Sequence, residues 1–382
     1  MIENIGESTR RDFLFGCLRN GLGIGATFAF FQLCPADSLK TENLPDSDAI
    51  TELKRRWLKL DIAKIYGVEI PPSEDTKFLI ENDLFWENRD SLSRTPTPLS
   101  VSELKAFKEA LASIPYAGHL AHFLIPYRFH DSESPVWQKT KGIYLGREWE
   151  QALKDYSLET LDKDKVIAIF LADDIDLDKP IEPHMEAIGI ERYISSTESK
   201  VFLGTYKDEL QWNTIHEYGH AFDNEVFFRA RGLERYQIEK KDRISLFDNI
   251  SAFNPIYQTF AKVNGWKLIP FEEALNTSVE YFIYDRKNNI WPYSSPGVWR
   301  RDPEVWGEPG AQREIRLSIY AQVRPIDEVF AEYFAASRLQ PDLLTPQEKR
   351  YFDKIHNGLM RNPEKFMSQV ASYSEILLMP VG

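Results

Sequence analysis

The chain has 382 residues, 43% of them hydrophobic and 13% aromatic, so it can bury a sizeable core and is neither largely disordered nor a multi-span membrane protein. Its 59 acidic and 46 basic residues give a formal net charge of −13, which disfavours nucleic acid and anionic lipid as partners. Only two cysteines occur, Cys17 and Cys34, which excludes a disulfide framework and a multi-thiolate zinc site.

Residues 1–36 have the features of an export signal. The pair Arg10-Arg11 is followed by Phe13-Leu14, then by a short, glycine-containing apolar stretch and by small residues near Ala36. This order resembles a twin-arginine signal peptide, which implies export to the periplasm or beyond and removal of the segment. The apolar stretch is shorter than the ~20 residues of a membrane span, so no stable transmembrane anchor is expected. A retained anchor and a lipoprotein site at Cys34 are the alternatives.

Residues 37–98 predict a small helical region that ends in a linker. Apolar residues recur at helical spacing from about Ala49 to Tyr66 and from Thr76 to Trp86. The segment 91–100 contains two prolines among small polar residues, which resist both helix and sheet formation.

Residues 99–382 predict one α+β domain with a small mixed sheet and a predominantly helical C-terminal half. Apolar runs rich in β-branched and aromatic residues predict strands at 165–171, 192–195 and 200–206. Apolar spacings of three and four residues predict helices at 101–114, 208–230, 255–263, 326–339 and 346–360. Ser102 is the expected capping residue of the first of these helices.

The helix expected at 208–230 contains the strongest chemical signal, His216-Glu217-Tyr218-Gly219-His220. Two histidines four residues apart lie on one helix face, separated by about 6 Å of rise, so both imidazoles can reach one cation. Glu217 then lies beside that cation, as a general base for water requires. Gly219 costs up to ~1 kcal/mol relative to alanine inside a helix, which indicates a close approach by another element.

A catalytic zinc site needs a third protein ligand and an open position. The sixth residue after His220 is Val226, so the histidine extension of one large group of zinc peptidases is absent. The helix expected at 326–339 offers Glu328 and Glu332 on one face. One carboxylate can bind the metal while the other accepts the free N–H of a ligand histidine. The rival third ligands are Glu272, Glu273 and Glu280.

These motifs together resemble a known family. The run 216–223, then Tyr320, then the run Glu328-Val329-Phe330-Ala331-Glu332-Tyr333-Phe334 resembles the catalytic domain of anthrax toxin lethal factor and its relatives, which include the secreted Pro-Pro endopeptidases. The resemblance implies a zincin-like metallopeptidase fold over 99–382, with a long insertion at 231–319.

The resemblance also implies roles for the motif residues in a gluzincin site with one zinc ion per chain. The implied zinc ligands are His216, His220 and Glu328. Glu217 is then the general base, Glu332 supports a ligand histidine, and Tyr320 polarises the substrate carbonyl.

The function expected from the sequence is therefore an exported zinc metalloendopeptidase that hydrolyses protein or peptide substrates. The alternative is a catalytically inactive zincin-like protein that binds a partner or the cell envelope. The aromatic, proline-rich and glycine-rich segment 291–310 is either a packed loop, which we favour, or a lid or docking surface. His119 and His122 share a helical spacing, but Pro115 and Gly118 weaken that helix, so both are expected to be structural.

Overall fold

The computed structural model describes residues 47–71, 98–129, 142–145, 166–181, 201–230, 254–264, 266–270, 297–301, 317 and 326–379. The chain divides into two units, Met1–Leu53 and Lys54–Gly382, and the boundary falls within helix α3 (Ser47–Tyr66). Only the first residues of α3 are described in the first unit, and every other element below belongs to the second. The expected export signal, the expected helix at 76–86 and the expected strand at 192–195 lie outside the described residues. Among the described helices, none is both long enough and apolar enough to cross a membrane.

The main sheet is small and mixed. Its described strands are β1 (Phe123–Phe129), β2 (Gly142–Leu145) and β3 (Val166–Ala172), in the order β1-β3-β2. Strand β3 runs parallel to β1 and antiparallel to β2, so β2 lies at an edge of the described sheet. All residues of β3 are buried, which accounts for its unbroken apolar sequence. A separate antiparallel pair joins β4 (Trp266–Pro270) to β5 (Gly297–Arg301).

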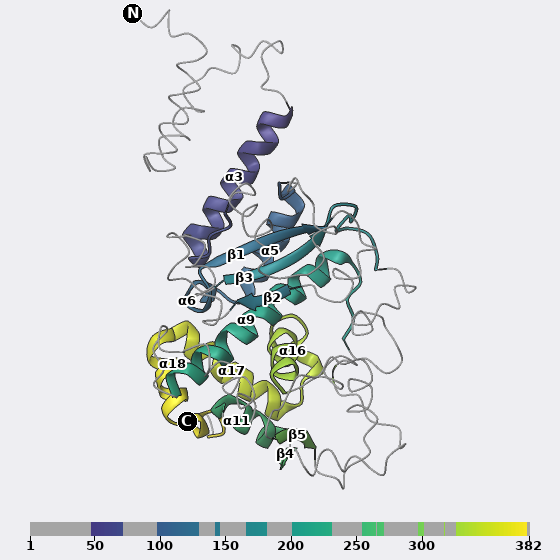
Figure 1. Ribbon diagram of the computed structural model, residues 1–382. Helices are drawn as coiled ribbons and strands as arrows, with labels where there is room; N and C mark the ends of the chain where they lie inside the picture. Colours follow the sequence, from purple (N-terminus) through teal and green to yellow (C-terminus); the bar gives the residue numbers. More distant parts are fainter. Residues whose placement is uncertain are drawn as a thin grey trace, which may run out of the picture. The chain divides into compact units, whose positions relative to one another are not determined.

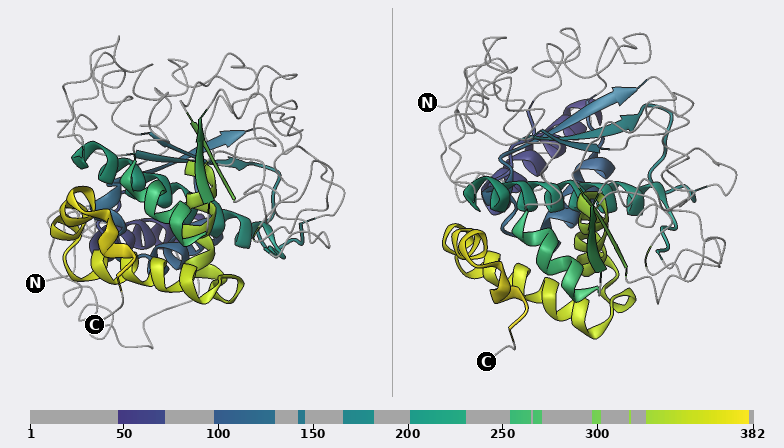
Figure 2. Two further views of the ribbon diagram at one scale, coloured as in Figure 1. Left: turned by 90° about the horizontal axis from the view of Figure 1, so that it is seen from below. Right: turned by 60° about the horizontal axis from the view of Figure 1, so that its bottom comes forward.

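Helix α9 (Tyr206–Ala230) lies at the centre of the second unit. The other described helices that lie wholly in this unit are α5 (Val101–Ser113), α6 (Ala117–Leu120), α11 (Pro255–Val263), α16 (Ile326–Leu339), α17 (Pro346–Arg361) and α18 (Pro363–Ser372), with short 3-10 turns at Pro341–Leu343 and Ser374–Leu377. Helix α9 packs against the sheet and against α5, α11, α16 and α18. Figures 1 and 2 show the sheet on one side of α9 and the C-terminal helices on the other. The fold is therefore mixed α and β, and mostly helical.

Aromatic side chains fill the core between α9 and the C-terminal helices. Phe222 of α9 stacks on both Phe330 and Phe334 of α16, with ring centroids 6.3 Å apart in each pair. Phe260 of α11 meets Phe330 edge to face at 5.5 Å, and Phe352 of α17 lies 5.5 Å from the same ring. Such pairs contribute about 0.5–1.5 kcal/mol each beyond their buried area. The cluster therefore fixes α16 against α9, the two helices that contain the sequence motifs.

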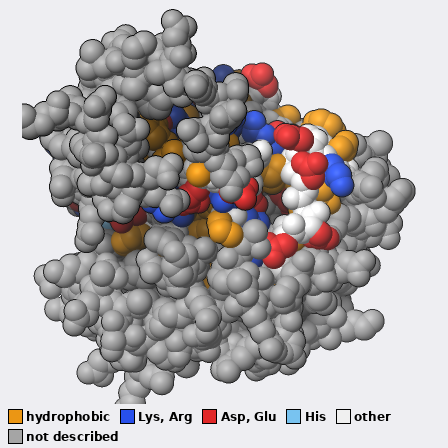
Figure 3. Space-filling model, turned by 90° about the horizontal axis from the view of Figure 1, so that it is seen from above, with side chains coloured by type: hydrophobic (Ala, Val, Ile, Leu, Met, Phe, Trp, Pro, Cys, Tyr) orange, Lys and Arg blue, Asp and Glu red, His pale blue; other side chains and the backbone are white. Residues whose placement is uncertain are grey.

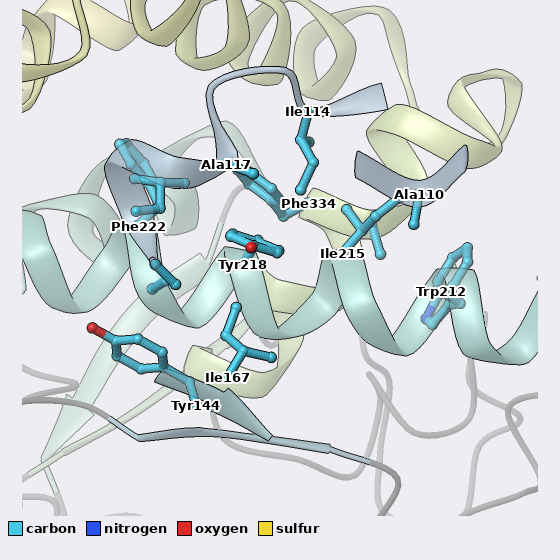
Figure 4. Packing of buried hydrophobic residues seen from close by; sticks show 14 of the residues in the cluster. Ala110, Ile114, Ala117, Tyr144, Ile167, Trp212, Ile215, Tyr218, Phe222 and Phe334 are labelled. Atoms are coloured by element: carbon cyan, nitrogen blue, oxygen red, sulfur yellow. The ribbon is translucent and has the colours of Figure 1, made fainter. Parts of the chain in front are cut away.

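Figure 4 shows the part of the core that surrounds α9. Ile215, Tyr218 and Phe222 lie among side chains from α5, α6, the sheet and α16. Helix α9 is buried on nearly every side, so its sequence has apolar residues around most of its circumference rather than a single stripe. A central helix of this kind holds its polar side chains in fixed positions.

A buried histidine, His356 of α17, connects three elements of the core. Ser337 Oγ donates to the carbonyl of Phe334 and lies 2.7 Å from His356 Nε2, so the histidine donates from Nε2. Its Nδ1 then accepts a hydrogen bond from the hydroxyl of Tyr116. Burial, followed by the charge of Arg338, holds the pKa of His356 well below its ordinary value, so the imidazole stays neutral. Its role is structural.

Two sequence predictions for the segments before α5 and α9 are wrong. Ser100, not Ser102, caps α5: its hydroxyl accepts from Glu103 N, and the Glu103 carboxylate accepts from Ser100 N at 2.7 Å. The expected strand at 200–206 is a loop with an isolated bridge at Thr205, because Thr205 and Asp208 form reciprocal hydrogen bonds that start α9 at Tyr206. A capping pair therefore overrides the β-branched run.

Most long helices follow their predicted bounds. Helices α11 and α16 match the expected ranges, and α9 and α17 differ from theirs by one or two residues. The strand expected at 165–171 is β3. Strands β1 and β2 and helix α18 were not predicted. Helix α11 lies within the segment 231–319, where it packs on α9 and α16, so at least this part of the segment belongs to the core.

Candidate metal centre

The imidazole rings of the two histidines of α9 lie side by side with their Nε2 atoms close together, as their spacing predicts. The ring centroids of His216 and His220 are 4.9 Å apart, and the two Nε2 atoms are 3.2 Å apart. His216 is buried and His220 is mostly buried. Two imidazole nitrogens aimed at one point present two lone pairs to the same position.

Glu328 of α16 brings a carboxylate to this position. Its Oε2 atom lies 3.2 Å from His216 Nε2 and 3.7 Å from His220 Nε2. The three atoms therefore form a triangle with sides of 3.2, 3.2 and 3.7 Å. Among the described residues, His216, His220 and Glu328 form a group that can hold a metal ion. The sequence motifs, far apart in the chain, are thus brought together.

Glu332, one turn further along α16, lies on the other side of the His216 ring. His216 Nδ1 is 3.1 Å from Glu332 Oε1, and the indole N–H of Trp212 donates to the same oxygen at 2.9 Å. The Glu332 side chain is completely buried. A buried carboxylate is costly unless it is hydrogen-bonded, and these two donors meet that need. The ring of His216 is consequently held between two carboxylates, with Nε2 directed toward Glu328.

The second histidine has a carboxylate on its far side as well. His220 Nδ1 lies 3.7 Å from Oδ2 of Asp223, which is completely buried. The hydroxyl of Tyr257 donates to that Oδ2 at 2.7 Å, and Asn224 donates to Oδ1 at 2.9 Å. The sequence motifs indicate no role for Trp212, Asp223 or Tyr257. The available signal for Asp223 is its position three residues after a candidate ligand histidine, on a neighbouring part of the same helix face.

The pKa values of His216, His220 and Glu328 are shifted in the directions that their mutual contacts predict. Burial lowers the pKa of His220, but the hydrogen bonds and charges of Asp223 and Glu328 outweigh this effect and raise it well above its ordinary value. The pKa of His216 is also raised, because Glu328 and Glu332 outweigh burial. Burial raises the pKa of Glu328, but the two histidines outweigh it and hold that pKa well below its ordinary value.

Further acidic groups surround the two histidines. Burial, and then the charge of Glu328, raises the pKa of Asp327 to about 6. With Asp223, Glu328 and Glu332, four carboxyl groups lie around the two imidazoles, a surplus of acidic groups that suits a divalent cation.

Glu217 lies against β2, a strand at one edge of the described sheet. Its side chain is buried, and a Cβ atom placed on Gly142 of β2 would lie 2.9 Å from both Cγ and Oε1 of Glu217. The nearest atom after these is Cδ1 of Ile169, at 3.1 Å. Only a glycine at position 142 leaves room for the Glu217 side chain in this position.

The expected close approach at Gly219 is confirmed. A Cβ atom at this position would lie 2.9 Å from the backbone Cα of Ala331 and 3.2 Å from the Cβ of Phe334. Backbone atoms of α16 therefore occupy the space where a side chain would be. This contact brings the face of α16 that contains Glu328 to the two histidines.

The remaining candidates lie elsewhere. Tyr320 and the rival ligands Glu272, Glu273 and Glu280 fall outside the described residues, as does most of the aromatic segment 291–310. His119 lies on the short helix α6 and His122 just before β1, and both are exposed.

The donor set fits a small divalent cation. Ligand atoms at two corners of a tetrahedron about 2.0–2.1 Å from its centre are roughly 3.3 Å apart, close to the sides of the observed triangle. Calcium and magnesium prefer oxygen ligands and larger coordination numbers, whereas imidazole with one carboxylate suits a transition-series ion.

Comparison of the chain with protein-family models, with curated proteins and with solved structures finds no match.

Proposed function

We propose that the protein is an exported zinc metalloendopeptidase of the gluzincin type with a zincin-like fold. The observation that carries the proposal is the triangle of His216 Nε2, His220 Nε2 and Glu328 Oε2, with sides of 3.2, 3.2 and 3.7 Å. Two imidazoles and one carboxylate, with a position left for water or substrate, form the donor set of a hydrolytic zinc site. The resemblance of the motifs to the lethal factor family supports the same function.

The residues of the chain divide the work of hydrolysis. His216, His220 and Glu328 hold the ion, and Glu332 keeps the His216 ring in place through Nδ1. A bound zinc ion supplies Lewis acidity, which makes water nucleophilic near neutral pH and polarises a peptide carbonyl.

Glu217 is the proposed general base. Its position next to the first histidine lets it accept a proton from the attacking water and deliver that proton to the leaving amine. The peptide C–N bond breaks, one product gains a carboxylate and the other an amine. The role of Tyr320, support of the developing oxyanion, rests on the resemblance alone.

The proposed location, outside the cytoplasm, rests on the twin-arginine-like residues 1–36. The proposed substrates are proteins or peptides. The acidic net charge of −13 supports neither nucleic acid nor anionic lipid as a partner.

One set of variants tests the proposal. We expect the full chain to retain one zinc ion after dialysis and to cleave members of a peptide library, as measured by metal analysis and mass spectrometry. Glu217→Gln is expected to keep its zinc and to lose hydrolysis by about 100- to 10,000-fold, because only the proton transfer is removed. Glu328→Gln is expected to lose most of its zinc, because a charged ligand becomes a weak neutral one.

Glu109→Gln is the matched control, because the Glu109 carboxylate is half exposed on α5 and pairs with Lys207. It should equal the wild type in zinc content and in hydrolysis. Undiminished hydrolysis by Glu217→Gln, or a wild-type chain that retains no zinc, would overturn the proposed function. Zinc binding with no cleavage in any library would instead favour the inactive binding protein.

A further inference from the structure

Each candidate ligand histidine has a buried carboxylate on its Nδ1 side, and each carboxylate is held by an aromatic donor. For His216 the carboxylate is Glu332, held by the indole N–H of Trp212. For His220 it is Asp223, held by the hydroxyl of Tyr257. The first of these pairs lies between α9 and α16. The second depends on α11, a helix from the segment 231–319.

Helix α11 is fastened to α9 at Asp223 by two contacts of different kinds. The hydroxyl of Tyr257 donates to the Asp223 side chain at 2.7 Å. The side-chain amide of Asn254, the N-cap residue of α11, donates to the Asp223 carbonyl at 3.1 Å, while its oxygen accepts from the backbone N–H of Ile256. Asp223, Asn254 and Tyr257 are all completely buried. The start of α11 is thus fixed relative to the turn of α9 that follows His220.

The contact also determines how the His220 ring is used. An anionic oxygen 3.7 Å from Nδ1 favours the proton on that nitrogen, which leaves the lone pair on Nε2. The hydroxyl of Tyr257 donates to Oδ2 and the amide of Asn224 donates to Oδ1, so the two hydrogen bonds together fix the orientation of this carboxylate. Burial raises the pKa of Asp223, and its contacts with His220, Tyr257 and Asn224 oppose that rise.

We propose that Asp223 and Tyr257 are positioning residues that hold His220 Nε2 toward the metal, so that α11 takes part in metal binding. The inference rests on the proposed function for its metal site. A helix within the long segment 231–319 thus has a role that the ligand motifs do not reveal.

The test compares two tyrosine variants that each lose one buried hydroxyl. Tyr257→Phe removes the donor to Asp223. Tyr351→Phe is the matched control, because the Tyr351 hydroxyl also bonds to α11, at the carbonyl of Ile256 (3.1 Å) and the hydroxyl of Thr259 (3.0 Å), but not to Asp223. Zinc affinity is measured by competition with a chromophoric chelator, and the thermal unfolding of each metal-free variant is measured in parallel.

We expect Tyr257→Phe to bind zinc about 10- to 100-fold more weakly than the wild type, the usual effect of removing an outer partner of a metal ligand. Tyr351→Phe should lower the thermal stability of the metal-free protein to a similar degree and keep wild-type zinc affinity. A second readout is the visible absorption of the Co²⁺-substituted protein, which reports ligand geometry. It should shift at saturating Co²⁺ in Tyr257→Phe and in Asp223→Asn, but not in Tyr351→Phe.

The possible results separate the two proposals. Wild-type zinc affinity and an unchanged Co²⁺ spectrum in Tyr257→Phe overturn the positioning role and leave the proposed function intact. Equal losses of affinity in both tyrosine variants overturn it too, because the effect would then be one of packing. A wild-type chain that binds no zinc overturns the proposed function itself, and the inference with it.

Discussion

At the scale of single residues, the position of Glu217 depends on a neighbouring residue that has no side chain. Gly142 on β2 and the Glu217 carboxylate share a space in which a single methyl group would stand 2.9 Å from two Glu217 atoms. Carbon atoms in contact normally remain about 3.5–4.0 Å apart, so one of the groups would have to move. The flanking Ile169 side chain, at 3.1 Å, limits the other direction.

Gly142→Ala should therefore displace Glu217 without contacting the proposed metal ligands. We expect zinc content to equal that of the wild type and kcat to fall at least 10-fold, because a general base must lie within hydrogen-bond reach of its water. Steady-state kinetics on a cleaved peptide, together with metal analysis, measure both quantities.

Gly204→Ala serves as the control for this change, because a Cβ at Gly204 meets its nearest atom at an ordinary 3.4 Å. It should leave kcat unaltered. A normal kcat in Gly142→Ala would show that Glu217 works from a different position.

The sequence predicted the residues at the centre of the site better than those around it. Spacing of four on a helix was enough to place His216 beside His220 and Glu328 beside Glu332 on common faces. The partners Trp212, Asp223 and Tyr257 could not be predicted in the same way. Their hydrogen bonds cross between helices, and which faces meet is decided by tertiary packing.

At the scale of elements, the distance between α9 and α16 decides whether the ligand triangle can form. Gly219 lets the two helices approach until Ala331 Cα would lie 2.9 Å from an added Cβ. The aromatic stack of Phe222 on Phe330 and Phe334 fixes the same contact nearby. Glycine at position 219 therefore lowers the stability of the helix itself but allows the two backbones to approach closely.

Gly219→Ala is expected to destabilise the protein and to weaken zinc binding together. Overpacking costs about 1–3 kcal/mol, which exceeds the gain of up to ~1 kcal/mol that alanine brings to a helix interior. Denaturant unfolding of the metal-free protein and a zinc competition titration measure the two effects.

A stabilised Gly219→Ala variant with unchanged zinc affinity would contradict the close approach. Lys207→Ala, a half-buried change in the first turn of the same helix that removes an ion pair with Glu109 and adds no atoms, is the comparison for a substitution to alanine without overpacking.

Element prediction succeeded where the apolar period was long and failed where local hydrogen bonds compete with it. Helices α11 and α16 begin and end at the predicted residues, since each has a clear periodic pattern. The run at 200–206 has strand-forming residues, but Thr205 and Asp208 pair as a helix cap, and the chain turns into α9. Strand β1 contains Pro126 and Arg128, which mask its strand pattern.

At the scale of the whole molecule, the metal would join parts of the chain that are distant in sequence. The net charge is −13, yet the described side chains on the face shown in Figure 3 are of both signs. Four acidic side chains, Asp223, Asp327, Glu328 and Glu332, lie around the two histidines. A divalent cation bound there would be surrounded by these acidic groups and would link α9 to α16.

Removal of the metal should consequently lower the thermal stability of the whole protein. A ligand at about 1,000 times its Kd adds roughly 4 kcal/mol to the free energy of unfolding. For domains of about 150–250 residues, a gain of this size corresponds to a rise in Tm of roughly 8–16 °C. Differential scanning calorimetry of the protein with zinc and with a chelator measures the difference.

Magnesium is the control ion for this measurement, because it binds poorly to imidazole. It should leave the Tm of the metal-free protein unchanged. Equal Tm values with zinc and with chelator would mean that the ion does not link the two helices.

The ligand triangle has a consequence for the order of events during synthesis. Two of its corners, His216 and His220, leave the ribosome long before the third, Glu328, has been translated. Until α16 emerges and packs on α9, a nascent chain therefore offers only two of the three proposed ligands and binds the ion with low affinity. Tight binding of the ion would therefore require that Glu328 has been translated and that α16 has packed on α9.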